Sequence, residues 1–469
     1  MSVTLEKIVN LSKQRGFVFH GSEIYGGLAN TWDYGPLGAQ LKKNVRDIWW
    51  KDFVEKRQDV VGLDTAILMN PKTWEASGHV AGFSDPLMDC KKCKARERAD
   101  KLIELWQKEN DSQETPKNWA GEKTPSKDLL DFINTKNILC PTCGKKDWTE
   151  PKAFNLMFKT HQGVTQEVGK EIYMRPETAQ GIFVNFKNVL DTTRKKLPFG
   201  IAQIGKSFRN EITPGNFTFR TREFEQMEIE YFIEPGTEDE QLEYWKDIVG
   251  NWYKQYGLKE KNIRLRQHGK EELSHYSSGT FDYEYNFPWG WGELVGIASR
   301  TDFDLKAHET HSGQDLKYTD PYNNARKFIP YVIEPSFGLD RSVLTFLIDA
   351  YNEEKLPDGS MRIVLKLHKK LVPIQVAILP LKKNEERIVK IAHEITSRLA
   401  HEGVLTQYDD TGAIGKLYRR QDEIGTPYCV TVDFDTLEDD TVTLRDRDTM
   451  QQERLSIVDL IDRIVKEFK

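Results

Sequence analysis

The sequence predicts an α/β protein of the α+β type, in which helices flank an antiparallel sheet and a second, mixed-sheet α/β domain follows. Three observations predict this fold class. From residue 200 to residue 298, β-rich segments follow one another through hairpin-like or irregular links, without the helices of βαβ units, which favours antiparallel pairing. After about residue 365 the predicted order changes to βαβαββα. No Gly-x-Gly-x-x-Gly or Walker-type loop occurs, so side chains would have to hold any nucleotide.

Two helices and a strand are predicted at the start of the chain. An amphipathic helix covers Thr4 to Arg15, and a glycine-rich turn region follows from Gly21 to Gly38. A second helix runs from Leu37 to about Lys56, and an apolar strand from Thr65 to Met69 stops at Asn70-Pro71. The second helix is predicted by apolar residues at three- and four-residue spacing: Leu41, Val45, Ile48 and Trp49.

The remaining elements divide the chain into residues 1–365 and 366–469. Residues 95–135 are polar and helix-prone, and indicate an insertion at about 84–150. Further strands of the first domain are expected at 154–159, 171–174, 200–208, 218–232, 263–267, 280–287 and 293–298. The second domain is expected to hold strands at 374–379, 405–408, 428–434 and 441–447, and helices at 385–401, 414–423 and 457–468.

Composition limits the classes of function. A chain of 469 residues is long enough for two to four domains with ample core. Its formal net charge is −6, so any nucleic acid would have to meet local basic patches, such as residues 194–196 or 416–420. No run of ~18 apolar residues exists, which excludes a membrane span. The N-terminus lacks the basic-then-apolar order of a secretory signal, so we predict a cytoplasmic protein.

Four of the five cysteines form two Cys-x2-Cys pairs. Each pair can place two thiolates on one tight turn, and two such turns supply a structural four-cysteine zinc site with no open coordination position. The alternative is four reduced thiols on an exposed insertion. The predicted zinc ligands are Cys90, Cys93, Cys140 and Cys143, whereas Cys429 is predicted to be an inert core residue.

Two distant arginines suggest the chemistry. Arg209 lies in Phe-Arg-Asn-Glu, and Arg341 closes a Gly-Leu-Asp-Arg segment. Guanidinium groups are planar, permanently charged and bidentate towards phosphate oxygens, so the pair could hold a polyphosphate from opposite ends. The segment around Phe224 adds an aromatic surface and carboxylates. This combination indicates ATP-dependent activation of an amino acid.

These segments resemble the class II aminoacyl-tRNA synthetases, and within them the dimeric, single-chain glycyl-tRNA synthetases. Residues 208–211 resemble the second signature motif of the class, residues 338–341 the third, and the helix and strand ending at Pro71 the first. Three longer stretches resemble the glycine enzymes themselves: Trp32 to Gly38, Arg175 to Gly181 and Glu334 to Gly338. The C-terminal domain resembles the anticodon-binding module of the histidine, proline and threonine enzymes. The resemblance covers nearly the whole chain.

The resemblance implies an ATP site with magnesium. Arg209 would neutralise the α-phosphate, Arg341 would hold the γ-phosphate, and Phe224 would lie under the adenine. Glu293 and Glu334 would be the metal-side carboxylates, because Mg²⁺ prefers oxygen ligands. Arg209, Glu211 and Arg341 are the expected catalytic residues. The whole expected ATP site is Arg209, Asn210, Glu211, Phe219, Arg220, Thr221, Arg222, Glu223, Phe224, Glu293, Leu294, Gly338, Leu339, Asp340 and Arg341.

The resemblance also implies a glycine pocket, with negative charge for the ammonium group and no room for a β-carbon. Glu177 and Glu228 would supply the charge, and Ser336 would narrow the pocket. Pro-Glu-Thr at 176–178 equally fits an ordinary helix start, and Arg98 lies in a charged run typical of a solvated face. The expected glycine-binding residues are Arg98, Glu177, Phe224, Glu225, Gln226, Met227, Glu228, Glu334, Pro335, Ser336, Phe337 and Gly338.

The expected partners are therefore ATP, glycine, tRNA(Gly) and a second copy of the chain, with no membrane. The rival hypotheses are a synthetase of the same class for another small amino acid, and an inactive paralogue that binds tRNA or a protein. In the C-terminal domain, the mixed charges of residues 419–423 and 445–448 fit either salt bridges or tRNA contacts. Five histidines lack mutual metal spacing and are interpreted as structural or surface residues: His79, His161, His268, His275 and His308.

Overall fold

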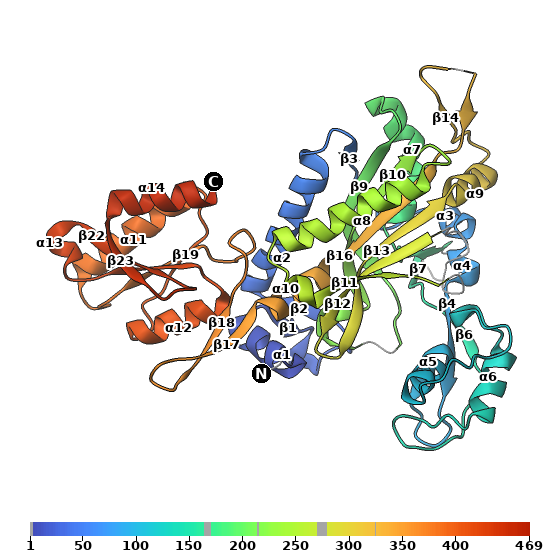
Figure 1. Ribbon diagram of the computed structural model, residues 1–469, viewed down its shortest axis with the longest axis horizontal. Coiled ribbons are helices and arrows are strands. Elements are labelled where there is room, and N and C mark those ends of the chain that lie inside the picture. Colours follow the sequence, from blue (N-terminus) through green and yellow to red (C-terminus); the bar gives the residue numbers. More distant parts are fainter. Residues whose placement is uncertain (1–2, 164–169, 213–214, 270–278, 324) are drawn as a thin grey trace.

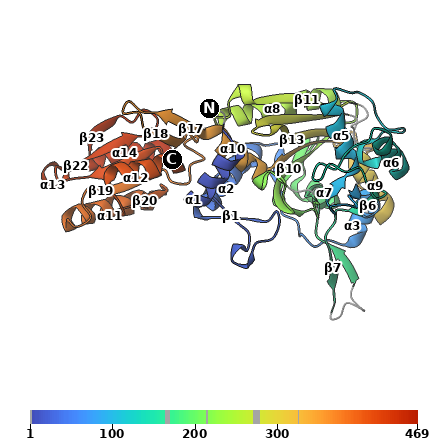
Figure 2. The same ribbon diagram turned by 90° about the horizontal axis from the view of Figure 1, so that it is seen from below.

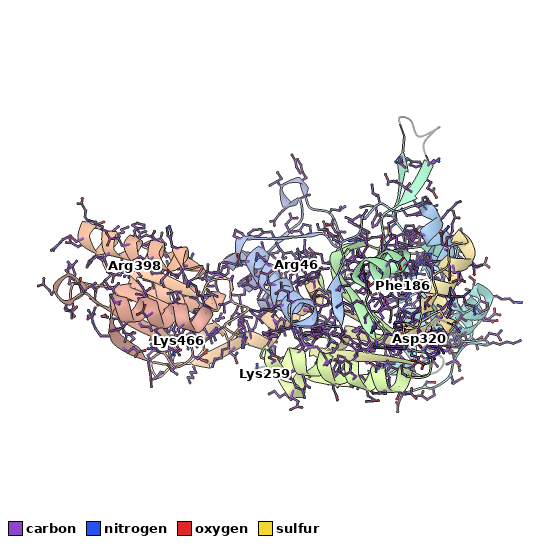
Figure 3. All side chains as sticks on the ribbon, turned by 90° about the horizontal axis from the view of Figure 1, so that it is seen from above. Arg46, Phe186, Lys259, Asp320, Arg398 and Lys466 are labelled. Carbon is purple, nitrogen blue, oxygen red and sulfur yellow. The ribbon has the colours of Figure 1, made fainter. Side chains whose placement is uncertain are left out.

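The computed structural model describes residues 3–163, 170–212, 215–269, 279–323 and 325–469. The chain forms a larger body around a central sheet and a smaller C-terminal body beside it (Figure 1). Figure 3 labels Arg398 and Lys466 on the smaller body and Phe186 on the larger one. No helix among the described residues combines the length and the apolarity needed to cross a membrane.

The central sheet has seven strands in the order β11-β12-β13-β16-β10-β9-β3. Every neighbouring pair is antiparallel except β3 and β9. The predicted antiparallel sheet is therefore confirmed, with one parallel edge strand. Its strands are β3 (Val60–Gly62), β9 (Phe199–Phe208), β10 (Glu223–Ile233), β11 (Ile263–Gln267), β12 (Gly279–Phe287), β13 (Gly290–Thr301) and β16 (Tyr331–Gly338).

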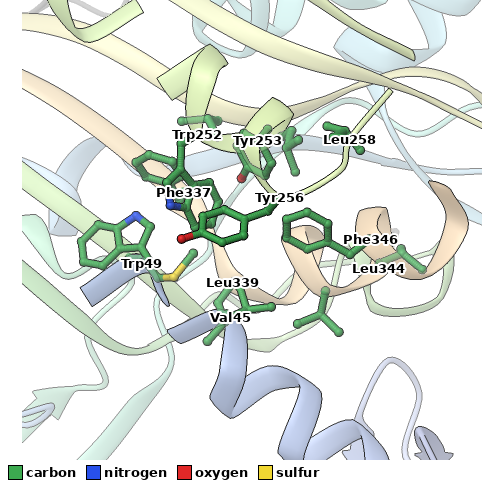
Figure 4. Packing of buried hydrophobic residues seen from close by; sticks show 14 of the residues in the cluster. Val45, Trp49, Trp252, Tyr253, Tyr256, Leu258, Phe337, Leu339, Leu344 and Phe346 are labelled. Atoms are coloured by element: carbon green, nitrogen blue, oxygen red, sulfur yellow. The ribbon is translucent and has the colours of Figure 1, made fainter. Parts of the chain in front are cut away.

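Helices cover both faces of the sheet, because side chains alternate between the faces of each strand. On β10, Met227, Ile229 and Tyr231 belong to the core under α2, α8 and α10, whereas Phe232 joins the core under α7 and α9. Aromatic rings dominate the first core (Figure 4). The helices are α2 (Pro36–Trp50), α7 (Ala179–Thr193), α8 (Glu238–Gln255), α9 (Phe303–Ser312) and α10 (Leu339–Ala350).

The N-terminal elements confirm the two predicted helices. Helix α1 (Leu5–Arg15) begins after Thr4, whose side chain accepts a hydrogen bond from the Lys7 amide, and it ends at Gly16 with φ of 75°. A short hairpin of β1 (Val18–His20), η1 (Glu23–Tyr25) and β2 (Trp32–Tyr34) follows. Helix α2 continues into η2 (Lys51–Glu55), and its predicted apolar face is buried or nearly so: Leu41, Val45, Ile48 and Trp49.

The strand predicted at 65–69 is wrong. The edge strand is β3 instead, and Leu68 makes only an isolated bridge to Met174 while remaining 55% exposed. The β3–β9 pairing ends at Gly62, and the Thr65 carbonyl oxygen accepts a hydrogen bond from the Arg175 side chain at 2.9 Å. Two short helices then begin after Asn70, α3 (Pro71–Ala76) and α4 (His79–Gly82).

Other boundaries also differ from the prediction. The start of the strand predicted at 218–232 is a 3-10 turn, η4 (Phe217–Phe219). The link between β10 and β11 was expected to be hairpin-like or irregular, but it contains helix α8. Strand β16 and the hairpin β17–β18 were not predicted. The remaining small elements of the large body are η5 (Glu260–Asn262), β14 (Tyr318–Thr319), β15 (Lys327–Phe328), β17 (Tyr351–Lys355) and β18 (Met361–Leu365).

The predicted insertion forms a separate lobe (Figure 1). A three-stranded sheet, β5-β4-β6, packs with two helices around its own small core. The hairpin β7–β8 projects from the large body nearby (Figure 2). The elements are β4 (Ser84–Asp89), β5 (Arg96–Arg98), α5 (Ala99–Glu109), η3 (Gly121–Lys123), α6 (Ser126–Thr135), β6 (Lys152–Asn155), β7 (Lys159–Gln162) and β8 (Lys170–Tyr173).

The C-terminal body confirms the predicted mixed sheet, with strand order β20-β19-β21-β22-β23. Helices α11 and α14 cover one face and α12 the other, where Cys429 is buried as predicted. Strand β23 and helix α13 were not predicted. The elements are β19 (Val376–Pro380), α11 (Glu386–His401), β20 (Thr406–Tyr408), α12 (Ile414–Ile424), β21 (Tyr428–Val432), α13 (Thr436–Asp439), β22 (Thr441–Asp446), β23 (Gln452–Ser456) and α14 (Ile457–Phe468).

A buried ionic network joins the two bodies. Asp422 on α12 and Arg362 on β18 are both inaccessible to solvent and lie 2.8 Å apart. Arg445 donates two further hydrogen bonds to Asp422, at 2.9 and 3.1 Å. Two buried guanidinium groups therefore share one buried carboxylate, and Arg362 has a second partner in Glu354 at 2.8 Å.

Asp422→Ala should lower the free energy of unfolding by about 3–5 kcal/mol, because it leaves Arg445 buried without an anion and Arg362 with Glu354 alone. Urea unfolding followed by fluorescence measures the loss. The control is Glu453→Ala, which removes an exposed partner of Arg463 and should cost less than about 1 kcal/mol. Equal losses in the two variants would contradict the assigned importance of the buried network.

Candidate active site

A cavity of about 310 Å³ opens at the middle of the central sheet. Its walls come from strands β10, β12, β13 and β16, from the η4 turn and from the start of α10. Most of the predicted site residues line it: Glu177, Arg209, Glu211, Phe219, Arg220, Thr221, Phe224, Glu225, Gln226, Glu228, Glu293, Glu334, Ser336, Phe337, Gly338, Asp340 and Arg341.

Arg341 is fixed at one side of the cavity. Its Nε donates to the Phe219 carbonyl oxygen at 3.1 Å, and its guanidinium lies 4.4 Å from the centre of the Phe219 ring. Its Nη1 lies 3.1 Å from a carboxylate oxygen of Glu293. Burial opposes ionisation of Glu293, but Arg341, aided by Arg209, lowers its pKa. The two arginines predicted from the sequence thus act electrostatically on one carboxylate.

Arg209 is oriented by uncharged groups. Its Nε donates to the Pro176 carbonyl oxygen at 3.0 Å. Its guanidinium lies 5.3 Å from the centre of the Phe224 ring and 5.4 Å from that of Phe83. Cation–π contact and a carbonyl hydrogen bond orient the guanidinium without neutralising it.

Glu228 lies at the other end of the cavity and is almost fully buried. One of its carboxylate oxygens accepts from Ser336 Oγ at 2.8 Å, and the other accepts from Thr178 Oγ1. Gln226 Nε2 lies 3.4 Å from both Glu228 Oε1 and Ser336 Oγ. This end of the cavity is narrow, acidic and rich in hydrogen-bonding groups.

Arg300 connects the carboxylates beside Glu228. Its Nη1 donates to Glu334 at 2.6 Å, and its Nε and Nη2 donate to Asp304 at 2.8 and 2.9 Å. Burial raises the pKa of Glu334 well above its usual range, with Glu228 and Glu177 adding to the effect and Arg300 opposing it. A buried cation thus balances part of the negative charge in the pocket.

Glu177 takes part in a second set of contacts in the same pocket. His79 Nε2 lies 3.4 Å from one carboxylate oxygen, and Gln180 donates to the other at 3.0 Å. Burial opposes ionisation of Glu177, but His79, Arg300 and Gln180 together lower its pKa. Helix α7 begins at Ala179, and Thr178 makes no side-chain cap. Glu177 therefore lies just before a helix start, as the alternative interpretation had it, and it also lines the cavity.

Three carboxylates meet at this end of the cavity. Oxygens of Glu228, Glu230 and Glu334 lie within 4.8 Å of one another. Glu230 is fully buried, and neither of its carboxylate oxygens has a hydrogen-bond partner. Burial, reinforced by Glu334, raises the pKa of Glu230 well above its usual range. Glu334 therefore groups with Glu228 and Glu230, whereas Glu293 is paired with Arg341.

Several predicted site residues do not line the cavity. The side chain of Arg222 donates to the Glu211 and Ala29 carbonyls, and Glu223 pairs with Lys206. Arg98 lies in the insertion, outside the lining, held by Asp85 at 2.7 Å and Asp100 at 2.6 Å, so its glycine-binding role stays a prediction. The other predicted residues outside the lining are Asn210, Met227, Leu294, Pro335 and Leu339, of which the last four are buried among the core elements.

Two of the five histidines lie at or beside the cavity. His268 lines the cavity and its Nε2 lies 2.7 Å from Asp282, and His79 contacts Glu177. His308 is buried against Gln180, and His161 is exposed, as interpreted. His275 lies outside the described residues.

Other functional residues were missed because no short motif marks them. Arg300 lies near the end of β13 and Asp282 in the middle of β12, and neither is flanked by a motif residue. A charged residue at an inward position of a central strand was the available signal. The cavity lining that the sequence did not predict is Thr218, His268, Thr280, Asp282, Gly296, Ala298 and Arg300.

The four predicted cysteines come together in the insertion. Their sulfur atoms all lie within 4.8 Å of one another, with 3.6 Å between Cys90 and Cys143 and 3.6 Å between Cys93 and Cys140. Each pair sits on a tight turn, closed by amides of Lys94 and Gly144 that donate to the carbonyls of the first cysteines. Backbone amides, first that of Cys93, lower the pKa of Cys90 to about 7. Four sulfur ligands in this arrangement could hold one metal ion.

The comparison with known proteins begins with the C-terminal body. Residues 375–467 match the family model of the anticodon binding domain. This range covers the whole of the second sheet, from β19 to β23, and most of α14.

Full-length relatives are also close in sequence. The Glycine--tRNA ligase of Alkaliphilus oremlandii is 58% identical over 466 residues, which make up 99% of each chain. That of Acetivibrio thermocellus is 59% identical over 466 residues, covering 99% of this chain and 98% of the relative. That of Clostridium beijerinckii is 60% identical over 459 residues, or 97% of both chains. Identity of this extent confirms the resemblance, and the chain belongs to the glycine--tRNA ligase family.

Proposed function

We propose that this protein activates glycine with ATP to form glycyl-adenylate and pyrophosphate, and then transfers glycine to the 3′ end of tRNA(Gly). Two arginines oriented into one cavity, with an acidic pocket at its other end, carry this proposal. The cavity therefore offers separate places for a polyphosphate and for an amine. Membership of the glycine--tRNA ligase family supports it further.

For the activation step, we assign the phosphates to the two arginines. Arg209 would meet the α-phosphate, where negative charge accumulates as the glycine carboxylate attacks, and Arg341 would hold the γ-phosphate. A fixed cation at the reacting phosphate stabilises the transition state more than the ground state. Phe224, stacked beside Arg209, is the proposed adenine platform. The attacking carboxylate is already ionised, so positioning and charge carry the step without a general base.

For glycine, we assign the ammonium group to the acidic end of the cavity. Glu228 is fixed there by Ser336 and Thr178, and Glu177, whose pKa is lowered, adds negative charge. Ser336 and Gln226 bond the same carboxylate and occupy the space that a larger side chain would need. Every competing amino acid is larger than glycine, so steric exclusion is sufficient for selectivity.

We propose Glu293 as the magnesium ligand of this chain. It faces the cavity beside Arg341, and its carboxylate is held in the ionised form that Mg²⁺ requires. A bound magnesium ion would neutralise phosphate charge. Glu334 was expected to share this role, but its bonds with Arg300 and its closeness to Glu228 favour the glycine pocket instead.

We further propose that the chain divides into a catalytic domain, residues 1–365, and an anticodon-binding domain, residues 366–469. Separate sheets and separate cores support this division, as does the family match at 375–467. The proposed insertion at about 84–150 has its own core and would hold structural zinc on its four cysteines. A homodimer and a cytoplasmic location, where tRNA, ATP and glycine are available, complete the proposal.

Amino-acid-dependent ATP–pyrophosphate exchange tests the activity. We expect exchange with glycine and none with alanine, serine or proline. Arg209→Ala should lower the exchange rate by about 10²–10³-fold, as expected when a fixed donor to a developing charge is lost. Arg326→Ala, which removes an exposed arginine paired with Glu234, is the matched control and should retain the wild-type rate. A normal rate in Arg209→Ala would refute its role.

Metal analysis of freshly reduced protein tests the zinc proposal. We expect about one zinc ion per chain, and Cys93→Ser together with Cys140→Ser should abolish binding because two of four thiolates are lost. Cys429→Ala, which changes the buried cysteine of the C-terminal body, should keep the zinc. Wild-type protein free of zinc would refute this proposal and leave the catalytic one intact.

A further inference from the structure

A cluster of polar and charged side chains extends outward from the wall of the cavity, which two of its members line. Its members, Tyr34, Lys42, Glu225 and Asp340, are here called the Asp340 cluster. Asp340 Oδ1 accepts from Tyr34 Oη at 2.7 Å and from Lys42 Nζ at 2.8 Å, and Asp340 Oδ2 accepts from the Glu225 amide at 2.7 Å. Lys42 Nζ also lies 2.9 Å from a carboxylate oxygen of Glu225. One ammonium group thus bridges two carboxylates.

The Asp340 cluster ties together the two chain segments that carry the proposed ATP residues. Glu225 directly follows Phe224 on β10, and Asp340 directly precedes Arg341 in the first turn of α10. A shift of either cluster member would move its neighbour in the cavity, because each pair shares a peptide unit. The hydrogen bond from the Glu225 amide to Asp340 therefore fixes the distance between the Phe224 ring and the Arg341 guanidinium, the two groups proposed to contact one nucleotide.

The stretch Trp32 to Gly38 contributes Tyr34 to the Asp340 cluster and positions the start of α2, which carries Lys42. Tyr34 ends β2, and the Leu37 amide donates to the Gly16 carbonyl at 3.1 Å, which brings the start of α2 against the end of α1. A methyl group added at Gly38 would collide with the Phe17 carbonyl oxygen, so the close approach requires glycine there. Lys42 then lies one helical turn further along α2 and reaches Asp340.

The protonation states of Lys42 and Tyr34 allow both side chains to donate hydrogen bonds to Asp340. Burial opposes the charged form of Lys42, but Asp340 and Glu225 raise its pKa, so the ammonium is retained. Burial, with Asp340 beside it, raises the pKa of Tyr34 well above its usual range, so the hydroxyl keeps its proton and donates. Charge-assisted hydrogen bonds of this kind are about twice as strong as neutral ones.

We propose that Tyr34 and Lys42 are positioning residues for ATP, which act through Asp340 to set the Phe224 ring and the Arg341 guanidinium at a fixed spacing. This inference rests on the proposed function, because it assumes that both groups bind the nucleotide. It also assigns a role to the stretch Trp32 to Gly38, which resembles the glycine enzymes and supplies no side chain to the cavity lining.

Lys42→Met tests the proposal, because it keeps the length of the side chain and removes the ammonium. We expect the KM for ATP in pyrophosphate exchange to rise roughly tenfold or more, as for loss of charged hydrogen bonds, while the KM for glycine stays within about twofold. Lys43→Met is the matched control. Lys43 is exposed on the same helix and pairs with Asp47, so its loss should change neither constant.

Tyr34→Phe is the milder variant and removes a single hydroxyl from the cluster, so it remains informative if Lys42→Met folds poorly. It should raise the KM for ATP in the same direction, and Lys42→Arg should recover part of the loss because it restores the cation. The proposal is refuted if the KM for ATP is unchanged in folded Tyr34→Phe, or if the KM values for ATP and glycine rise together. Wild-type protein without glycine-dependent exchange would instead refute the proposed function.

Discussion

The register of β10 and β13 against β16 is the constraint on which the site depends. Antiparallel pairing places Glu228 opposite Ser336 and, on the other side, Gly296 opposite the same serine. Side chains alternate along each strand, so Met227 enters the core while its neighbours face the cavity. A slip of one residue would turn Glu228 into the core and an apolar side chain into the pocket. The sheet therefore sets the chemistry as well as the fold.

The sequence was sufficient to predict the helices whose apolar residues recur at a regular spacing. The apolar face of α2 and the helices of the C-terminal body follow directly from three- and four-residue spacing. The segment at 65–69 is equally apolar but forms no strand, because pairing of an edge segment depends on which neighbour it meets. Strand β16 was missed for a related reason: residues 334–338 were interpreted as a motif, and their pairing on both sides is a long-range property.

The candidate site also contains some residues that the sequence predicts and others that it does not. Arg209 and Arg341 are flanked by recognisable residues, and the structure brings both to one cavity. Arg300, His268 and Asp282 have no such flanks, and they reach the cavity only because β12 and β13 pair with each other and β13 pairs with β16. Local sequence therefore predicts residues that act within a motif, whereas residues that depend on tertiary pairing require the structure.

The way in which the two arginines are held explains why lysine would not replace them. Arg209 is oriented by the Pro176 carbonyl and the Phe224 ring, and Arg341 by the Phe219 carbonyl and ring. These four partners are uncharged and fix the direction of each guanidinium without cancelling its charge, whereas Glu293, 3.1 Å from Arg341, offsets part of the charge of that arginine. A lysine ammonium has no planar face to stack and no fork to share between a carbonyl and a phosphate. Orientation by neutral groups leaves the charge of Arg209 available to an anion in the cavity, which is the basis of its proposed place at the α-phosphate.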